Sequence, residues 1–205
     1  MPAEGRNTVV VTGFGPFEKH PVNASWEAVK HLQIIGLDNS SVQLHCEEVP
    51  VLYECVQTVL DKLWALKPAL VIHVGVNSEV NDVILERCAQ NCTDPQRKDI
   101  NGLASYCGDR CKADGPDQLR TELDLAQIAQ DLTIDPDLGV SAAVSNDAGK
   151  YLCNYIYYHS LCRDPQRTVF VHVPPLQQPY SAEQLGNCLR KIVQYCLLQL
   201  SKIDV

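Results

Sequence analysis

Apolar residues follow two different spacings along this chain. Continuous or alternating apolar runs, which are typical of β-strands, predict strands at residues 7–12, 41–49, 69–76, 81–91, 140–144 and 168–173. Between these runs the apolar residues recur at helical spacing, which predicts helices at 23–33, 53–66, 119–132, 151–161 and 180–202. Strands that alternate with helices favour an α/β fold. We expect residues 1–205 to form a single-domain, three-layer sandwich, with helices on both faces of a mostly parallel, twisted sheet.

Local signals refine this prediction. Asn23 precedes an amphipathic segment and is predicted to be the N-cap of that helix, and Ser181 with Gln184 has the spacing of a capping box. In the strand predicted at 81–91, the alternation places Glu86 and Cys88 on the same face. A carboxylate inside an apolar run is unfavourable without a partner, so Glu86 is a candidate functional group or one half of a salt bridge. His73 is interpreted as a satisfied core histidine.

Composition narrows the class of protein. The chain has 205 residues, of which 45% are hydrophobic and 20% charged, with a net charge of -8. An acidic protein is a poor match for nucleic acid or an anionic membrane surface. No apolar run reaches the roughly 20 residues that span a bilayer, and the N-terminus does not have the pattern of a signal peptide. We therefore expect a cytoplasmic protein whose ten cysteines are reduced thiols.

Residues 92–118 are polar and are predicted to form a surface loop or a short two-stranded flap. Four cysteines lie in or beside this segment: Cys88, Cys92, Cys107 and Cys111. Two C-x3-C pairs allow the hypothesis of a zinc-stabilised interaction module, although zinc ribbons more often place two residues between the members of a pair. Spectator thiols and no bound metal are the preferred interpretation.

One stretch combines a turn with a cysteine-bearing helix. Residues 145–149 (SNDAG) predict a turn and helix cap, and Cys153 lies in the first turn of the helix that follows. The unpaired N–H groups at a helix N-terminus favour a thiolate and are available for an oxyanion. His172 lies at the carboxyl end of a predicted strand, where open α/β sheets bind ligands. These residues are candidates for a thiolate–imidazole pair, with Glu86 as the first choice and Asp147 as the second choice for the acid.

Two of the three phenylalanines, Phe14 and Phe17, lie close together after the first predicted strand. They either cover the edge of the sheet or form an apolar wall of a pocket, and the sequence does not decide between these interpretations. The surrounding GFGPF lacks the third glycine of a dinucleotide-binding fingerprint, so a nucleotide site is disfavoured.

Six motifs occur in a fixed order: VTGFGPF (11–17), VNASWEAV (22–29), VIHVGV (71–76), LERCAQN (85–91), SNDAGKYLCNYIYY (145–158) and FVHVPPL (170–176). Together they resemble the pyroglutamyl-peptidase I family, also called pyrrolidone-carboxyl peptidases, and most of all its animal branch. Members are cysteine peptidases that remove an N-terminal pyroglutamate (5-oxoproline) from peptides through a thioester intermediate. The resemblance extends over about residues 8–198 and implies that no cofactor or metal is needed.

By resemblance, the nucleophile is Cys153, the base is His172 and the acidic residue is Glu86. The resemblance also implies a substrate pocket whose residues are Phe14, Phe17, Tyr151 and Leu152, with main-chain groups near Gly75 and Val76. A small, uncharged lactam ring fits an apolar slot if its N–H and C=O find one acceptor and one donor. A free α-ammonium group would be excluded, because it would enter the slot as an unpaired charge.

One segment departs from the family pattern. The family has small, glycine-containing residues after VIHVGV, whereas this chain has Asn77, Ser78 and Glu79. A carboxylate near the pocket would weaken substrate binding if it pointed inward. An alternative hypothesis is therefore a protein of the same shape that binds pyroglutamyl peptides without useful turnover. The sequence leaves monomer and homo-oligomer equally open.

Overall fold

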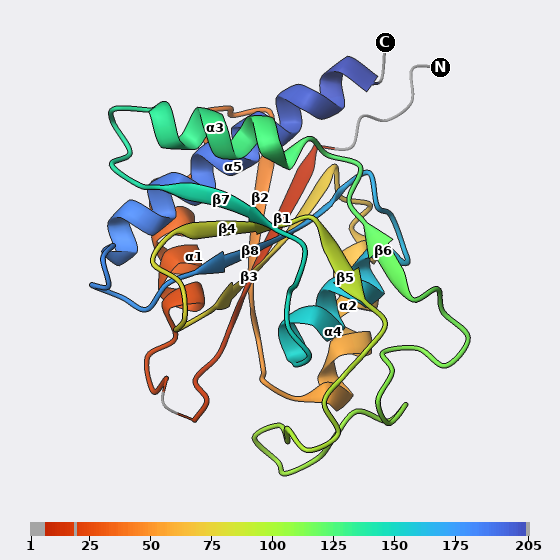
Figure 1. Cartoon of the computed structure of the whole chain (residues 1–205). Coiled ribbons are helices and arrows are strands. Elements are labelled where there is room, and N and C mark those ends of the chain that lie inside the picture. Colours follow the sequence, from red (N-terminus) through yellow and green to blue (C-terminus); the bar gives the residue numbers. More distant parts are fainter. Residues whose placement is uncertain (1–6, 19, 204–205) are drawn as a thin grey trace.

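The computed structural model describes residues 7–18 and 20–203. Its core is a six-stranded sheet in the order β2-β1-β3-β8-β4-β7 (Figure 1). All neighbouring strands are parallel except β4, which runs antiparallel to β8. The strands of this sheet are β1 (Thr8–Phe14), β2 (Gln43–Val49), β3 (Leu70–Val76), β4 (Val83–Glu86), β7 (Ala142–Ser145) and β8 (Thr168–Val173).

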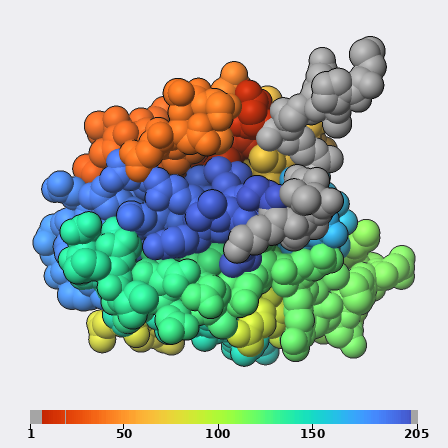
Figure 2. Space-filling view, turned by 90° about the horizontal axis from the view of Figure 1, so that it is seen from above, coloured from red at the N-terminus to blue at the C-terminus, as the bar shows by residue number. Residues whose placement is uncertain are grey.

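Helices cover both faces of the sheet. The first face packs against α1 (Ala24–Ile35), α3 (Leu125–Ile134) and α5 (Ala182–Ile203), and the second against α2 (Tyr53–Ala65) and α4 (Leu152–Leu161). Figure 2 shows the first face, where α5 (blue) crosses the molecule between the green residues around α3 and the orange N-terminal part. The prediction of a three-layer α/β sandwich with a mostly parallel sheet is confirmed.

The strand predicted at 81–91 is wrong in one respect, because two strands of different sheets occupy this range. β4 ends at Glu86, and β5 (Cys88–Gln90) pairs with β6 (Gln118–Arg120) in a separate two-stranded antiparallel ribbon. Arg87 is the link: its N–H donates to the carbonyl of Ser145 at 2.8 Å, and its carbonyl accepts from the N–H of Thr121. Glu86 therefore belongs to the main sheet, and Cys88 belongs to the ribbon.

The predicted helix at 119–132 also begins too early. Leu119 belongs to β6, and α3 starts only after Asp124, whose carboxylate accepts the N–H of Gln127 at 3.2 Å. The other predicted strands and helices are found with ends shifted by a few residues, as is usual for boundaries set by pairing and capping. His73 is fully buried and bonds Thr12 at 2.8 Å, but its Nε2 atom has no partner in the structure, so this core histidine is only half satisfied.

The loop at residues 91–117 connects the two ribbon strands and is held to α2 and α4 by hydrogen bonds. The buried carboxylate of Asp99 accepts the N–H of Tyr53 at the start of α2, and the hydroxyl of Tyr151 donates to the carbonyl of Lys98 at 2.9 Å. The hydroxyl of Tyr158 on α4 donates to the carbonyl of Pro116. The predicted flap is thus a ribbon with a long loop that packs against the sandwich.

Helix α4 differs from its prediction in two ways. It is buried almost all around rather than along one face, because it lies between the sheet, α2 and the 91–117 loop. Its N-cap is Tyr151 and no side chain caps it, whereas a cap was predicted in 145–149; Asp147 there accepts the N–H of Gly149 and shapes a turn. The cap at Asn23 and the capping box of Ser181 and Gln184 are confirmed.

In the described part of the chain, none of the helices is both long enough and apolar enough to cross a membrane. The N-terminal residues 1–6, on which the expectation about a signal peptide partly rests, lie outside the described residues.

The capping box gives a prediction about stability. Ser181→Ala removes the acceptor for the N–H of Gln184 at the start of α5, and we expect the free energy of unfolding to fall by about 1 kcal/mol. Urea unfolding followed by circular dichroism measures this. Ser201→Ala, an exposed position near the other end of α5, is the control and should change stability by less than about 0.5 kcal/mol. Equal effects of the two substitutions would contradict the capping role.

Candidate active site

Glu86 and His172 form a buried acid–imidazole pair on neighbouring strands. Glu86 is the last residue of β4, and His172 lies near the carboxyl end of β8, the antiparallel neighbour of β4. The Oε1 atom of Glu86 lies 2.8 Å from Nδ1 of His172, and the residues are only 1% and 5% exposed. A carboxylate this deep in an apolar core needs such a partner, and the bond orients the imidazole so that Nε2 is the free ring nitrogen.

Cys153 completes the group from α4, on the same face of the sheet as the side chain of His172. It is the second residue of α4 and is half-buried. Burial by itself lowers the pKa of His172, but the hydrogen bond and negative charge of Cys153, together with those of Glu86, outweigh it and raise the pKa to about 9. A raised pKa favours the protonated imidazole at neutral pH, and the three side chains follow one another in the order cysteine, histidine and glutamate.

The uncapped start of α4 leaves backbone donors beside the sulfur. The first intrahelical bond that joins α4 to its cap runs from the N–H of Tyr155 to the carbonyl of Tyr151. The N–H groups before it have no helical acceptor, and no side chain caps them. They carry the positive end of the helix dipole, which stabilises negative charge on the sulfur or on a substrate oxygen. Because no side chain caps α4, these N–H groups are available to an anionic sulfur or substrate oxygen.

Gly75 gives the sulfur its space. A Cβ atom at this position would lie 2.8 Å from Sγ of Cys153 and 2.9 Å from Cζ of Phe170, closer than real side chains approach one another. Phe170 is fully buried, and its ring centroid lies 4.8 Å from that of His172, so it cannot move aside freely. The main chain of β3 therefore passes directly behind the sulfur of Cys153.

A cavity of about 490 Å³ opens in front of Cys153 and His172. Of the predicted substrate-binding residues, Phe17, Val76 and Tyr151 line it. Phe14, Gly75 and Leu152 do not: Phe14 and Leu152 are buried behind the wall, in the core cluster that also contains Tyr151. Of the residues that depart from the family pattern, Glu79 lies on the rim and is exposed, and its N–H donates to the side chain of Asn77.

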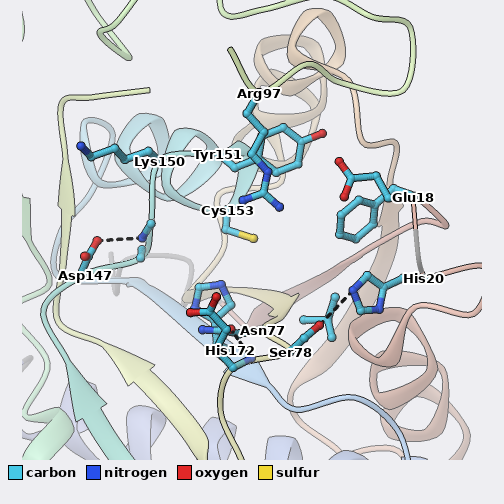
Figure 3. Close-up of a pocket in the computed structure, with 15 residues that line it drawn as sticks. Glu18, His20, Asn77, Ser78, Arg97, Asp147, Lys150, Tyr151, Cys153 and His172 are labelled. Carbon is cyan, nitrogen blue, oxygen red and sulfur yellow. Dashed lines mark hydrogen bonds between the residues drawn. The ribbon is translucent and has the colours of Figure 1, made fainter. Parts of the chain in front are cut away.

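The structure adds polar groups to the cavity that sequence reasoning missed: Glu18, His20, Arg97 and Lys150. Arg97 comes from the 91–117 loop and lies over the ring of Tyr151, with 4.3 Å between its Cζ atom and the ring centroid. Figure 3 shows its guanidinium pointing into the cavity above Cys153, whereas the ammonium group of Lys150 points away. No sequence pattern marked Arg97, because its position depends on how the loop packs.

The two competing assignments have little geometric support. Asp147, the second choice for the acid, is exposed and its carboxylate accepts the N–H of Gly149 instead of contacting His172. The described residues contain no group of three or more His, Cys, Asp or Glu side chains placed to hold a metal. Cys88 donates its S–H to the carbonyl of Asn146 at 3.0 Å, and Cys111 donates to the carbonyl of Cys92 at 3.4 Å. Burial raises the pKa of both thiols, which favours their protonated form over a metal-binding thiolate.

Comparison with known proteins agrees with this geometry. The sequence model of the family described as pyroglutamyl peptidase matches residues 7–194. The chain belongs to the pyroglutamyl peptidase family. It is 45% identical over 204 residues to pyroglutamyl-peptidase 1 of Rattus norvegicus, a match that covers 97% of this chain and 94% of that protein. The human pyroglutamyl-peptidase 1 is 44% identical, with 94% and 90% covered.

Solved structures of pyroglutamyl peptidases from microorganisms have the same fold. A mutant pyrrolidone carboxyl peptidase of Pyrococcus furiosus superposes with a TM-score of 0.83 at 27% identity, and the match covers 94% of this chain and 99% of that chain. The family match at 7–194 includes both strands that carry the acid–imidazole pair and the helix that carries Cys153. The predicted resemblance to the animal branch of the pyroglutamyl peptidase family is confirmed.

The raised pKa of His172 leads to a test of Glu86. The proton on His172 stabilises the fold fully below the ordinary pKa of 6.5, and this contribution is lost as pH rises through about 9. Glu86→Gln removes the negative charge, so we expect the imidazolium to be lost at least about one pH unit lower. The measurement is alkylation of Cys153 by iodoacetamide as a function of pH, followed at the level of the Cys153 peptide by mass spectrometry.

Asp147→Asn is the matched control, because it also removes one carboxylate from the cavity but keeps the oxygen that accepts from Gly149. Its profile should follow that of the wild type. A profile of Glu86→Gln that also matched the wild type would reject Glu86 as the partner of His172.

Proposed function

We propose that this protein is a cysteine peptidase that removes N-terminal pyroglutamate from peptides, with Cys153 as nucleophile, His172 as general base and acid, and Glu86 as the orienting carboxylate. The observation that carries the proposal is the convergence of these three side chains, with Cys153 and His172 lining one cavity and Glu86 bonded to His172 behind it, in a chain that belongs to the pyroglutamyl peptidase family. The names of its relatives in the rat and in Pyrococcus furiosus describe the same activity for those proteins.

The chemistry follows from the positions of the groups. The Cys153 thiolate attacks the carbonyl that joins pyroglutamate to the next residue, and the negative charge that develops on the oxygen is held by N–H groups at the start of α4. His172 gives its proton to the departing amine and then takes a proton from the water that hydrolyses the thioester. Glu86 orients the imidazole through Nδ1 and stabilises the imidazolium. Every step uses side chains and backbone groups of this chain.

The cavity walls match the proposed substrate. A pyroglutamyl ring is small, flat and uncharged, and Phe17, Val76 and Tyr151 offer apolar surface to it. Main-chain groups near Gly75 and Val76 are the proposed partners of the lactam N–H and C=O. An ordinary peptide would bring its α-ammonium group into a slot that already contains the guanidinium of Arg97, and this repulsion disfavours it. Phe14 and Leu152 support this slot from behind.

The proposal extends to the rest of the chain. Residues 1–205 would act as one peptidase domain, with pyroglutamyl peptides as the partners and neither nucleic acid nor membrane. A cytoplasmic location suits a nucleophile that is inactive when oxidised. Both a monomer and a homo-oligomer are compatible with a cavity that is complete within one chain.

Release of a fluorophore from a pyroglutamyl amide under reducing conditions tests the reaction and the nucleophile together. We expect turnover by the wild type and a loss of at least about 10³-fold in Cys153→Ala, because the covalent route is removed. Circular dichroism establishes that the variant is folded, and an alanyl amide serves as the control substrate that should not be cleaved. A folded, reduced wild type without turnover would contradict the proposed activity.

Arg97 provides a second test of the site. We expect Arg97→Gln to lower kcat about 10- to 100-fold, because a positive charge that faces the reacting atoms is lost. Lys150→Gln is the matched control: Lys150 lines the same cavity and carries the same charge, but it points away from Cys153, so kcat should change by less than about twofold. Similar losses in both variants would assign the effect to the overall charge of the cavity.

A further inference from the structure

A second cavity, of about 500 Å³, lies at the far end of α4 from Cys153. The structure brings three thiols from distant parts of the chain to it: Cys107 and Cys111 from the 91–117 loop and Cys162 from the C-cap of α4. Lys112 and Arg163 also line it. The proposed peptidase activity uses none of these residues.

The three thiols differ in their surroundings. Cys111 is buried, and burial raises the pKa of its thiol to about 12, while its S–H donates to backbone carbonyls of the loop. Cys107 and Cys162 are exposed. Of these two, Cys162 has the cations as neighbours: burial raises the pKa of its thiol, and the charges of Lys112 and Arg163 limit that rise. Lys112 and Arg163 are therefore placed to stabilise negative charge on the sulfur of Cys162.

The charged side chains that line this cavity are positive, whereas the molecule as a whole is negative. The protein carries a net charge of -8, yet no acidic side chain lines this cavity among the described residues. Arg163 donates to Asp61 outside it at 2.6 Å, so its charge is partly compensated, whereas Lys112 has no acidic partner among the ion pairs of the described chain. His159 adds no charge, because burial lowers its pKa to about 4 and its Nε2 contacts the carbonyl of Cys111 at 3.0 Å.

The first cavity is mixed in charge, because the cations Arg97 and Lys150 line it together with the carboxylates of Glu18, Glu79 and Asp147. A small anion with a reactive sulfur would thus meet charges of both signs at the first cavity, and lysine and arginine without an acidic side chain in the lining at the second. The wall of the second cavity also offers the rings of Tyr155 and His159, whose centroids lie 4.5 Å apart, and the amide of Gln57. Such a surface suits a short peptide.

We propose that the cavity at Cys162 is a modification site at which this thiol exchanges with an anionic, peptide-like disulfide, for which glutathione disulfide is the probe. The Cys162 sulfur, as its thiolate, attacks one sulfur of the disulfide. A new S–S bond joins it to one half of the reagent, and the old S–S bond breaks. The other half leaves as a thiolate and takes up the proton that Cys162 released, so the protein thiol is oxidised while half of the disulfide is reduced.

The site is physically linked to the catalytic cavity through aromatic rings. Tyr155 packs edge-on against Tyr53 with 5.0 Å between ring centroids, and Tyr53 packs edge-on against Tyr151 at 6.0 Å. Tyr151 lines the catalytic cavity. The proposal itself does not depend on the peptidase function, because it is tested by the attachment of a group and not by turnover.

The experiment uses the full chain with Cys153→Ala, so that the nucleophile cannot react. The protein is treated at pH 8 with three symmetrical disulfides of different charge: glutathione disulfide (anionic), 2-hydroxyethyl disulfide (neutral) and cystamine (cationic). Intact mass gives the rate of adduct formation, and peptide mapping gives the cysteine. Each rate is divided by the rate with the same protein unfolded in urea, which removes the intrinsic reactivity of the reagent.

We expect one adduct, at Cys162, and a normalised rate at least about threefold higher for glutathione disulfide than for cystamine, against the sign of the net charge. Lys112→Gln should abolish this preference. Lys62→Gln, which removes the same charge at an exposed site paired with Glu47, should leave it unchanged. Cys162→Ser should prevent the adduct, whereas Cys107→Ser should not.

Three results would overturn the proposal. The first is equal normalised rates for the anionic and cationic reagents, which would mean that the cavity exerts no selection. The second is an adduct that persists in Cys162→Ser and disappears in Cys107→Ser. The third is the loss of two hydrogens without an added group, which would show that the cavity closes an internal disulfide instead.

Discussion

The hydrogen bond between Glu86 and His172 is the constraint on which the rest of the site depends. Neither side chain is tolerated alone at 1% and 5% exposure, and the 2.8 Å contact makes each the partner of the other. The antiparallel insertion of β4 beside β8 produces this contact, since in the register of the two strands Ile84 lies opposite His172 and Glu86 lies two residues further along β4. A strictly parallel sheet would bring a different pair of residues together.

Cys153 is held beside this pair by the helix that carries it. Tyr157 on α4 donates its hydroxyl to the carbonyl of Glu86 at 2.8 Å, and its ring packs on Phe170. Asn154, the residue after Cys153, donates to the carbonyls of Gln90 and Cys92 and accepts the N–H of Gln90. Because these anchors are buried, α4 has little freedom to move relative to β4 and β5. The positions of sulfur and carboxylate are thus set by one hydrogen-bonded framework.

Much of this arrangement could be predicted from the sequence, because it depends on patterns within short segments of the chain. Continuous apolar runs identified β1, β3 and β8, and the turn before Cys153 with the strand end at His172 indicated the pair. The break at Arg87 could not be predicted, since the alternation of residues continues across it and only the pairing partner changes. The position of Arg97 could not be predicted for a related reason. It lies over Tyr151 because of loop contacts such as that of Asp99 with Tyr53.

The narrow space behind the nucleophile has a consequence for how such sequences vary. Positions 75 and 153 share a single volume, with the missing side chain of one occupied by the sulfur of the other. The glycine is required here by the size of a distant atom, and its backbone does not lie in the left-handed region. A smaller nucleophile, such as a hydroxyl, would leave part of that volume empty, but the ring of Phe170 would still oppose a methyl group at 75. Positions 75, 153 and 170 therefore share one steric constraint, in which the room for a side chain at 75 depends on both of the other two residues.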